Sequence, residues 1–87
     1  MEPQALIERI TRVLSAGFPG VVATLYPGES SDYITGWIVW SGFENVDHVE
    51  RRRMMKRALA GLAPGDLPYI GAILTLTPDE ASDEEAA

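Results

Sequence analysis

The stretch "SGFENVDHVERRRMMKRAL", residues 41–59, decides how we interpret the rest of the chain. Its second half is typical of an amphipathic helix, because at about 100° per residue several apolar side chains fall on one face. These are Met55, Ala58, Leu59 and, just beyond the stretch, Leu62. Asp47 is placed to be the helix N-cap, and Glu50 three residues later is its capping-box partner. We therefore predict a helix that begins after Asp47 and buries one face.

The same helix holds most of the positive charge of the chain. Five of the seven basic residues lie here, and they are Arg51, Arg52, Arg53, Lys56 and Arg57. On the expected helix Arg51 points toward the buried side and Arg52 lies at its edge, while the other three spread over the solvated face. A buried guanidinium needs hydrogen-bond partners, so one or two of these arginines must find them inside the fold.

One helix is predicted upstream, over residues 3–16. Its apolar residues form a single stripe at 3.6 residues per turn, and they are Leu6, Ile7, Ile10, Val13 and Leu14. Pro3 suits the first helical position, and Gly17 followed by Pro19 is a stop signal.

Two strands follow this helix, "GVVATLY" (20–26) and "YITGWIVWSGF" (33–43). The six-residue connection "PGESSD" (27–32) favours an antiparallel hairpin. Trp37 and Trp40 fall on opposite faces of the second strand, so we expect one in the core. The other is a candidate partner anchor, with edge packing as the alternative.

After the basic helix, "APGDLP" (63–68) ends the helix and "YIGAILTLT" (69–77) is the last strand. Alternation places Ile70, Ala72, Leu74 and Leu76 on one face, and Gly71, Ile73, Thr75 and Thr77 on the other. The order α-β-β-α-β predicts an α+β domain with a three-stranded mixed sheet and helices packed on one face. We place this single domain at residues 1–78.

Residues 79–87 are predicted to be an acidic, disordered tail. The formal charge of the 87-residue chain is −6, and the tail alone carries five carboxylates and no base. Without the tail the balance is 7 − 8 = −1, so the domain itself is nearly neutral. Such tails are usually solvated, and an alternative is that this one folds back on the arginine cluster.

Composition excludes several kinds of chemistry. The chain has no cysteine, so disulfides, thiolate metal sites and cysteine nucleophiles are absent. His48 is the one histidine, and in the first turn of a helix it is more often a cap or surface group than a ligand. No serine has an obvious base nearby, so we predict a non-enzymatic protein without a cofactor. No apolar run is long enough for a membrane span, and we expect a cytoplasmic protein.

These residues, taken together, resemble the BolA family, whose fold is similar to a type II KH domain. Ser41 and Phe43 match its Ser and Phe, Arg51 and Arg53 the outer arginines of its Arg-His-Arg triplet, and Leu59 a helix leucine. Ala72 matches the alanine of the last strand, and Thr77-Pro78-Asp79-Glu80 the common ending. The resemblance covers residues 33–80, and it implies a binding or regulatory module.

The departures from the family concern its metal chemistry. Arg52 replaces the histidine of the triplet, and Gly71 replaces a histidine that, in BolA-like proteins, ligates a [2Fe-2S] cluster shared with a monothiol glutaredoxin. Glycine has no donor atom. The hairpin loop offers only Glu29 and Asp32, and carboxylates are poor ligands for such a cluster. We therefore expect no cluster held in the family's manner.

Two functions follow from the resemblance. The first is a stress- or redox-linked transcriptional regulator or glutaredoxin-partner adaptor, which meets its partner through the arginine row or the outer sheet face. The alternative is KH-like nucleic-acid binding, in which the basic helix from Arg51 to Arg57 meets phosphates. A third interpretation of the row is a solvated helix face paired with Glu50. The oligomeric state, monomer or homodimer, is left open.

Overall fold

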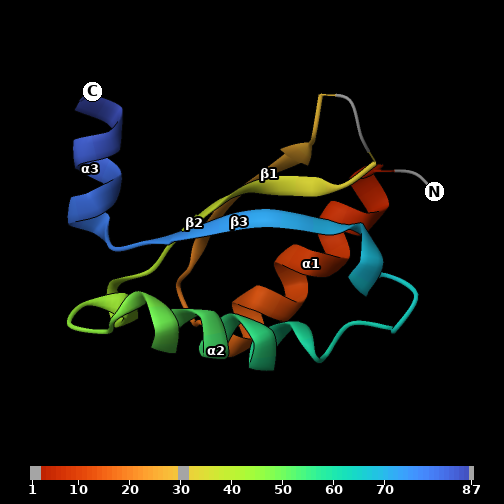
Figure 1. Ribbon diagram of the computed structural model, residues 1–87, viewed down its shortest axis with the longest axis horizontal. Helices are drawn as coiled ribbons and strands as arrows, with labels where there is room; N and C mark the ends of the chain where they lie inside the picture. The colour runs from red at the N-terminus through yellow and green to blue at the C-terminus, as the bar shows by residue number, and fades with distance from the viewer. Residues whose placement is uncertain (1–2, 30–31, 87) are drawn as a thin grey trace.

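The computed structural model describes residues 3–29 and 32–86, and Figure 1 shows their arrangement. The helices are α1 (Pro3–Gly17), α2 (His48–Leu59) and α3 (Pro78–Ala86), and the strands are β1 (Val22–Pro27), β2 (Ile34–Val39) and β3 (Ile70–Leu76). Short 3₁₀ turns lie at Ser41–Phe43 and Leu67–Tyr69. The predicted α-β-β-α-β order is confirmed, and α3 is added after it. None of the helices described is long and apolar enough to cross a membrane.

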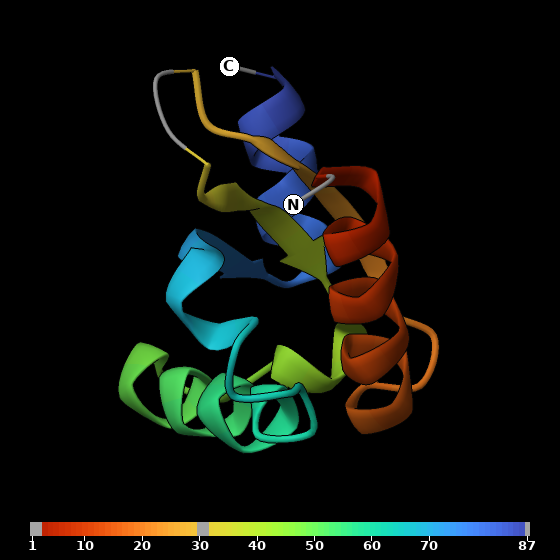
Figure 2. The ribbon, with the colours of Figure 1, turned by 90° about the vertical axis from the view of Figure 1, so that its right-hand side faces the viewer.

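The three strands form one mixed sheet in the order β1-β2-β3. β1 and β2 make the predicted antiparallel hairpin, in which Thr24 is opposite Trp37. β3 runs parallel to β2 on its other side, so α2 is the crossover between two parallel strands. Figure 2 shows α1 and α2 on the same side of the sheet, and β3 is left as an edge strand.

The core lies between this helical layer and one face of the sheet. Its buried apolar residues are Leu6, Ile10, Leu14, Phe18, Ile34, Ile38, Phe43, Met55 and Leu62. Gly36 allows β2 to lie close against β1, because its φ is 140° and an added Cβ would collide with the carbonyl oxygen of Thr24. The predicted stripe of the first helix therefore faces the sheet.

The predicted faces of the last strand need one correction. The register between β2 and β3 shifts, since Ile34 pairs with Ile70 but Gly36 pairs with Ile73. This β-bulge inserts one residue, so Ile70 and Ile73 both pack against the core whereas Ala72 and Leu74 are exposed. Strict alternation, which placed Ile70 on the face of Ala72, is wrong at this point.

The expected disordered tail also differs from the structure, which forms α3 over Pro78–Ala86. A complete capping box starts this helix: the Glu80 carboxylate accepts from the Thr77 amide at 2.7 Å, and the Thr77 hydroxyl accepts from the Glu80 amide at 3.2 Å. Pro78 lies at the first helical position, where no N–H is needed. The acidic residues of the first turn suit the positive end of the helix dipole.

Candidate functional site

Arg51 is the basic residue of α2 that points inward, as the helical pattern predicts. Only 6% of its surface is exposed, and its guanidinium donates to the carbonyl oxygens of Val46, Phe43 and Thr75. It also pairs with the Glu80 carboxylate at 2.7 Å. The guanidinium lies 5.6 Å from the centre of the Phe43 ring. Arg51 therefore joins α2 to β3 and α3, and its charge is used inside the molecule.

Arg53 and Arg57 lie on the opposite, solvated side of α2. Both reach the Glu50 carboxylate at 3.4 Å, and their side chains are 70% and 74% exposed. Asp47 caps the helix as predicted, with its carboxylate accepting from the Glu50 amide at 2.8 Å. Glu50 is shared by the two arginines, so it balances one of their two positive charges.

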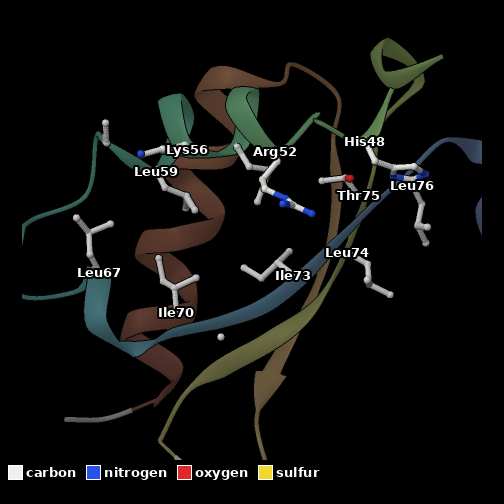
Figure 3. A pocket seen from close by; sticks show the side chains of 13 residues that line it. His48, Arg52, Lys56, Leu59, Leu67, Ile70, Ile73, Leu74, Thr75 and Leu76 are labelled. Carbon is white, nitrogen blue, oxygen red and sulfur yellow. The ribbon is translucent and has the colours of Figure 1, made fainter. Parts of the chain in front are cut away.

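Arg52 and Lys56 face a third direction, into a groove between α2 and β3 (Figure 3). The groove has a volume of about 690 Å³, within the usual range for ligand sites. Its lining residues are His48, Arg52, Met55, Lys56, Leu59, Ala60, Leu67, Ile70, Gly71, Ile73, Leu74, Thr75 and Leu76. Figure 3 shows His48 at the end next to Thr75 and Leu76, and Leu59 toward the end with Leu67 and Ile70.

The charge of the groove has one sign. His48, Arg52 and Lys56 follow one another at intervals of four residues, so they form a stripe along one face of α2. None of the described residues that line it is acidic, although the chain has 13 aspartates and glutamates. The remaining lining is mainly aliphatic. The groove is thus an apolar trough with a basic helical wall.

The other wall of the groove is the free edge of β3. The Trp40 amide donates to the Leu76 carbonyl at 3.0 Å, so the polar backbone groups of Leu76 face β2. Backbone groups alternate in direction along a strand, and Ile73 and Thr75 therefore present theirs to the open side. The Thr75 carbonyl indeed accepts from Arg51, off the sheet. The amides of Ile73 and Thr75 and the Ile73 carbonyl remain directed toward the groove.

The comparisons with known proteins identify the fold. No protein-family model matches the sequence, and no curated protein matches it. A solved structure described as a bol-like protein from Babesia bovis is similar, with a TM-score of 0.62 over 90% of this chain and 91% of that chain, at 20% sequence identity. The fold is BolA-like. The resemblance that the sequence suggested is thereby confirmed at the level of structure.

The residues of this BolA-like fold do not fit the cluster chemistry of the family. Gly71 lies at the bulge of β3 and offers no donor atom at the position of the family's histidine ligand. The residues that the structure describes contain no group of three or more His, Cys, Asp or Glu that could hold a metal ion. His48 stands apart from any such group. This donor set does not suit a [2Fe-2S] centre.

The two tryptophans lie in different environments. Trp40 is half-buried, packs against Phe18 and Phe43, and donates from its indole nitrogen to the Pro19 carbonyl at 2.9 Å. Trp37 lies on the open face of the sheet, in edge contact with Tyr26, and is 37% exposed. Beside Trp37, a smaller cavity of about 490 Å³ extends toward α3. Trp40 is thus part of the core rim, and Trp37 remains the candidate anchor.

Two carboxylates around the helical layer have lowered pKa values. The hydrogen bond from the Thr77 amide, aided by Arg51, lowers the pKa of Glu80. Arg9 donates two hydrogen bonds to Asp66, at 2.9 and 3.0 Å, and lowers the pKa of Asp66. Both carboxylates lie away from the groove lining, and both hold neighbouring elements together.

Proposed function

We propose that this chain is a non-enzymatic, BolA-like binding module that meets a partner protein in the groove between α2 and β3. The observation that carries the proposal is the combination of an aliphatic trough, a basic helical wall and an unpaired strand edge in one place. An exposed apolar groove beside a free edge is a common peptide-recognition geometry.

The groove supports a binding role better than catalysis. Its ionisable lining residues are His48, Arg52 and Lys56, and among the described lining residues they have no carboxylate partner. General acid–base or covalent chemistry requires such a pair within hydrogen-bond reach. Binding needs only shape, apolar contact and complementary charge.

Nucleic-acid binding, the alternative from sequence, is supported less well. Of the five basic residues of α2, Arg51 is buried and Arg53 and Arg57 share Glu50, which leaves Arg52 and Lys56. Phosphate contacts dominate the affinity of a protein for nucleic acid, and a chain of net charge −6 repels a polyanion. The aliphatic lining of the groove also suits a protein side chain better than a phosphate.

The resemblance to the BolA family suggests the first partner to test, a monothiol glutaredoxin. Because Gly71 supplies no ligand, we propose that such a partner docks through the groove without a shared cluster. The module would then act as a regulatory adaptor whose binding does not depend on iron. Titration with a cluster-free glutaredoxin measures this directly, and equal affinity with and without iron is the expected result.

The general proposal is tested by site-specific cross-linking in cells. A photoreactive residue replaces Ala60, which lines the groove, and in a control it replaces Gln4, an exposed residue of α1 outside it. We expect a protein adduct from position 60 alone, and Arg52→Glu should reduce its yield. The partner, identified by mass spectrometry, should bind the purified chain. Adducts with nucleic acid, or equal adducts from both positions, contradict the proposal.

A further inference from the structure

We infer that the groove takes an extended acidic segment of the partner, which adds to the open edge of β3 as a fourth strand. The inference rests on the proposed function and names its ligand: a strand with one aliphatic side chain followed, at alternate positions, by two carboxylates. Three features of the described residues support it.

The first feature is the backbone of β3. The Ile73 amide and carbonyl and the Thr75 amide point away from β2 into the groove. An added strand would pair with these groups, which otherwise depend on water. The Thr75 carbonyl already accepts from Arg51, so pairing is available up to this residue and ends there.

The second feature is spacing. Residues four apart on a helix are separated by about 6 Å along its axis. Side chains two apart on a strand repeat at about 6.6 Å. The stripe His48, Arg52, Lys56 and then Ala60 therefore has nearly the period of the groove-facing side chains of an added strand. Successive groove-facing residues of the segment can each meet one residue of α2.

The third feature is the order of chemistry along the groove. Leu59, Leu67 and Ile70 gather at one end, where Lys56 also lies beside Leu59, and Arg52 and then His48 follow toward the other end (Figure 3). An aliphatic side chain fits the first end, and carboxylates at the next two groove-facing positions reach Lys56 and Arg52. A segment of this pattern can run in either direction along β3.

The positive charge of the groove also indicates which kind of segment binds there. A second copy of this chain, pairing edge to edge through β3, would place its own basic stripe against the same groove, and like charges oppose this. Among the residues that the structure describes, no carboxylate lines the groove to balance Arg52 and Lys56. An acidic segment from another protein supplies that balance.

The test uses the full chain and blocked heptapeptides. The sequence T-L-T-E-T-E-T and its reverse cover both directions, and peptides with lysine in place of glutamate are the charge controls. We expect one of the acidic peptides to bind and to shift the amide NMR signals of Ile73 and Thr75. The lysine peptides should bind at least about tenfold more weakly. No binding by either acidic peptide overturns the inference.

Backbone pairing is tested by N-methylation. Alternate amides of a strand face one side, so methylating one alternate set should abolish binding while the other set is tolerated. Equal effects of the two sets contradict strand addition. If the amide NMR signals of Ile73 and Thr75 shift with protein concentration when no peptide is present, a second copy of the chain pairs with the edge of β3. This result would also overturn the inference.

The basic wall is tested by a matched pair of variants. Arg52→Glu with Lys56→Glu reverses two charges in the groove, and Arg53→Glu with Arg57→Glu reverses two on the solvated side of the same helix. We expect about a tenfold loss of peptide affinity for the first variant and less than about twofold for the second. Equal losses contradict the inference. If the peptides fail but the cross-linked partner still binds through position 60, the proposed function stands without it.

Discussion

Arg51 and Arg52 are neighbours in the chain, yet they belong to two different regions of the molecule. Arg51 is buried in the junction of α2, β3 and α3, where three carbonyl oxygens and Glu80 accept from its guanidinium. Arg52 is exposed along the groove, where the described lining holds no acidic side chain. Adjacent basic residues of one helix can therefore have different roles. A satisfied charge holds the fold, and an unsatisfied charge at an apolar groove is available to a partner.

The junction also explains a spacing that the sequence shows without a cause. Phe43 stands eight residues before Arg51, and its carbonyl and ring both contact the guanidinium. The same guanidinium reaches Glu80, the residue that closes the capping box of α3. Three segments that are distant in sequence therefore depend on one side chain.

The largest expected effect comes from removing that side chain. Arg51→Ala leaves the Val46 carbonyl oxygen without the donor from Arg51, and it removes the charge partner of Glu80. The Phe43 carbonyl oxygen loses one of two donors, since it keeps the Val46 amide. The free energy of unfolding should fall by about 3 kcal/mol. Arg52→Ala is the matched control and should change it by less than about 0.5 kcal/mol. Urea denaturation of both variants measures the difference. Similar losses of unfolding free energy in the two variants would contradict the different roles assigned to Arg51 and Arg52.

The second expected effect concerns the start of α3. Thr77→Ala removes the hydroxyl that accepts from the Glu80 amide and should cost about 1 kcal/mol of helix stability. Ser82→Ala, at an exposed position later in α3, is the control and should have little effect. Amide hydrogen exchange in α3 is the measurement. Unchanged protection in Thr77→Ala would contradict the role of the capping box.

Much of this fold was predictable because it depends on local patterns. The helical stripes, the hairpin and the cap at Asp47 all follow from spacing within a few residues, and so does the inward direction of Arg51. The mixed sheet was predicted from the order of the elements, because a helix between two strands of one sheet is the usual connection of a parallel pair. Each of these features is set by the chain near it.

The bulge of β3, the helix α3 and the groove were not predicted. The bulge and the groove depend on tertiary geometry, and the start of α3 has a sequence that fits two interpretations. The bulge at Gly71 follows from how β3 meets β2, and it reversed the face of Ile70. Thr77-Pro78-Asp79-Glu80 was interpreted as a strand end before a loose tail, although Thr and Glu three apart with Pro between them also predict a capping box. The groove could not be predicted, because Leu67 and Ile70 line the same groove as Arg52 only once β3 has docked beside α2.

Acid should weaken the junction and the loop contact of α1. Folding lowers the pKa values of Glu80 and Asp66, so their contribution is fully present above their ordinary values of 4.5 and 3.8. It is lost as the pH falls below these values through the lowered pKa values of the folded state. Glu80→Gln removes one of the two groups, so its stability should depend less steeply on pH between about 5 and 2. Parallel slopes for Glu80→Gln and the original chain, measured by urea denaturation, would contradict this assignment.

The smallest expected effect concerns Arg53 and Arg57, the two arginines on the solvated side of α2. Glu50→Gln removes the carboxylate shared by Arg53 and Arg57, but both contacts are 3.4 Å long and both arginines are exposed to solvent. Exposed ion pairs contribute little, so the free energy of unfolding should fall by about 0.5 kcal/mol, part of it from the helix dipole. Raising the salt concentration should shrink the difference, because salt screens surface charges. Binding of the acidic heptapeptide to the groove should stay within about twofold, since the freed charges lie on the other face of α2. A marked gain in peptide affinity would mean that all the basic residues of α2 attract the peptide. It would contradict the claim that Arg52 and Lys56 alone bind it.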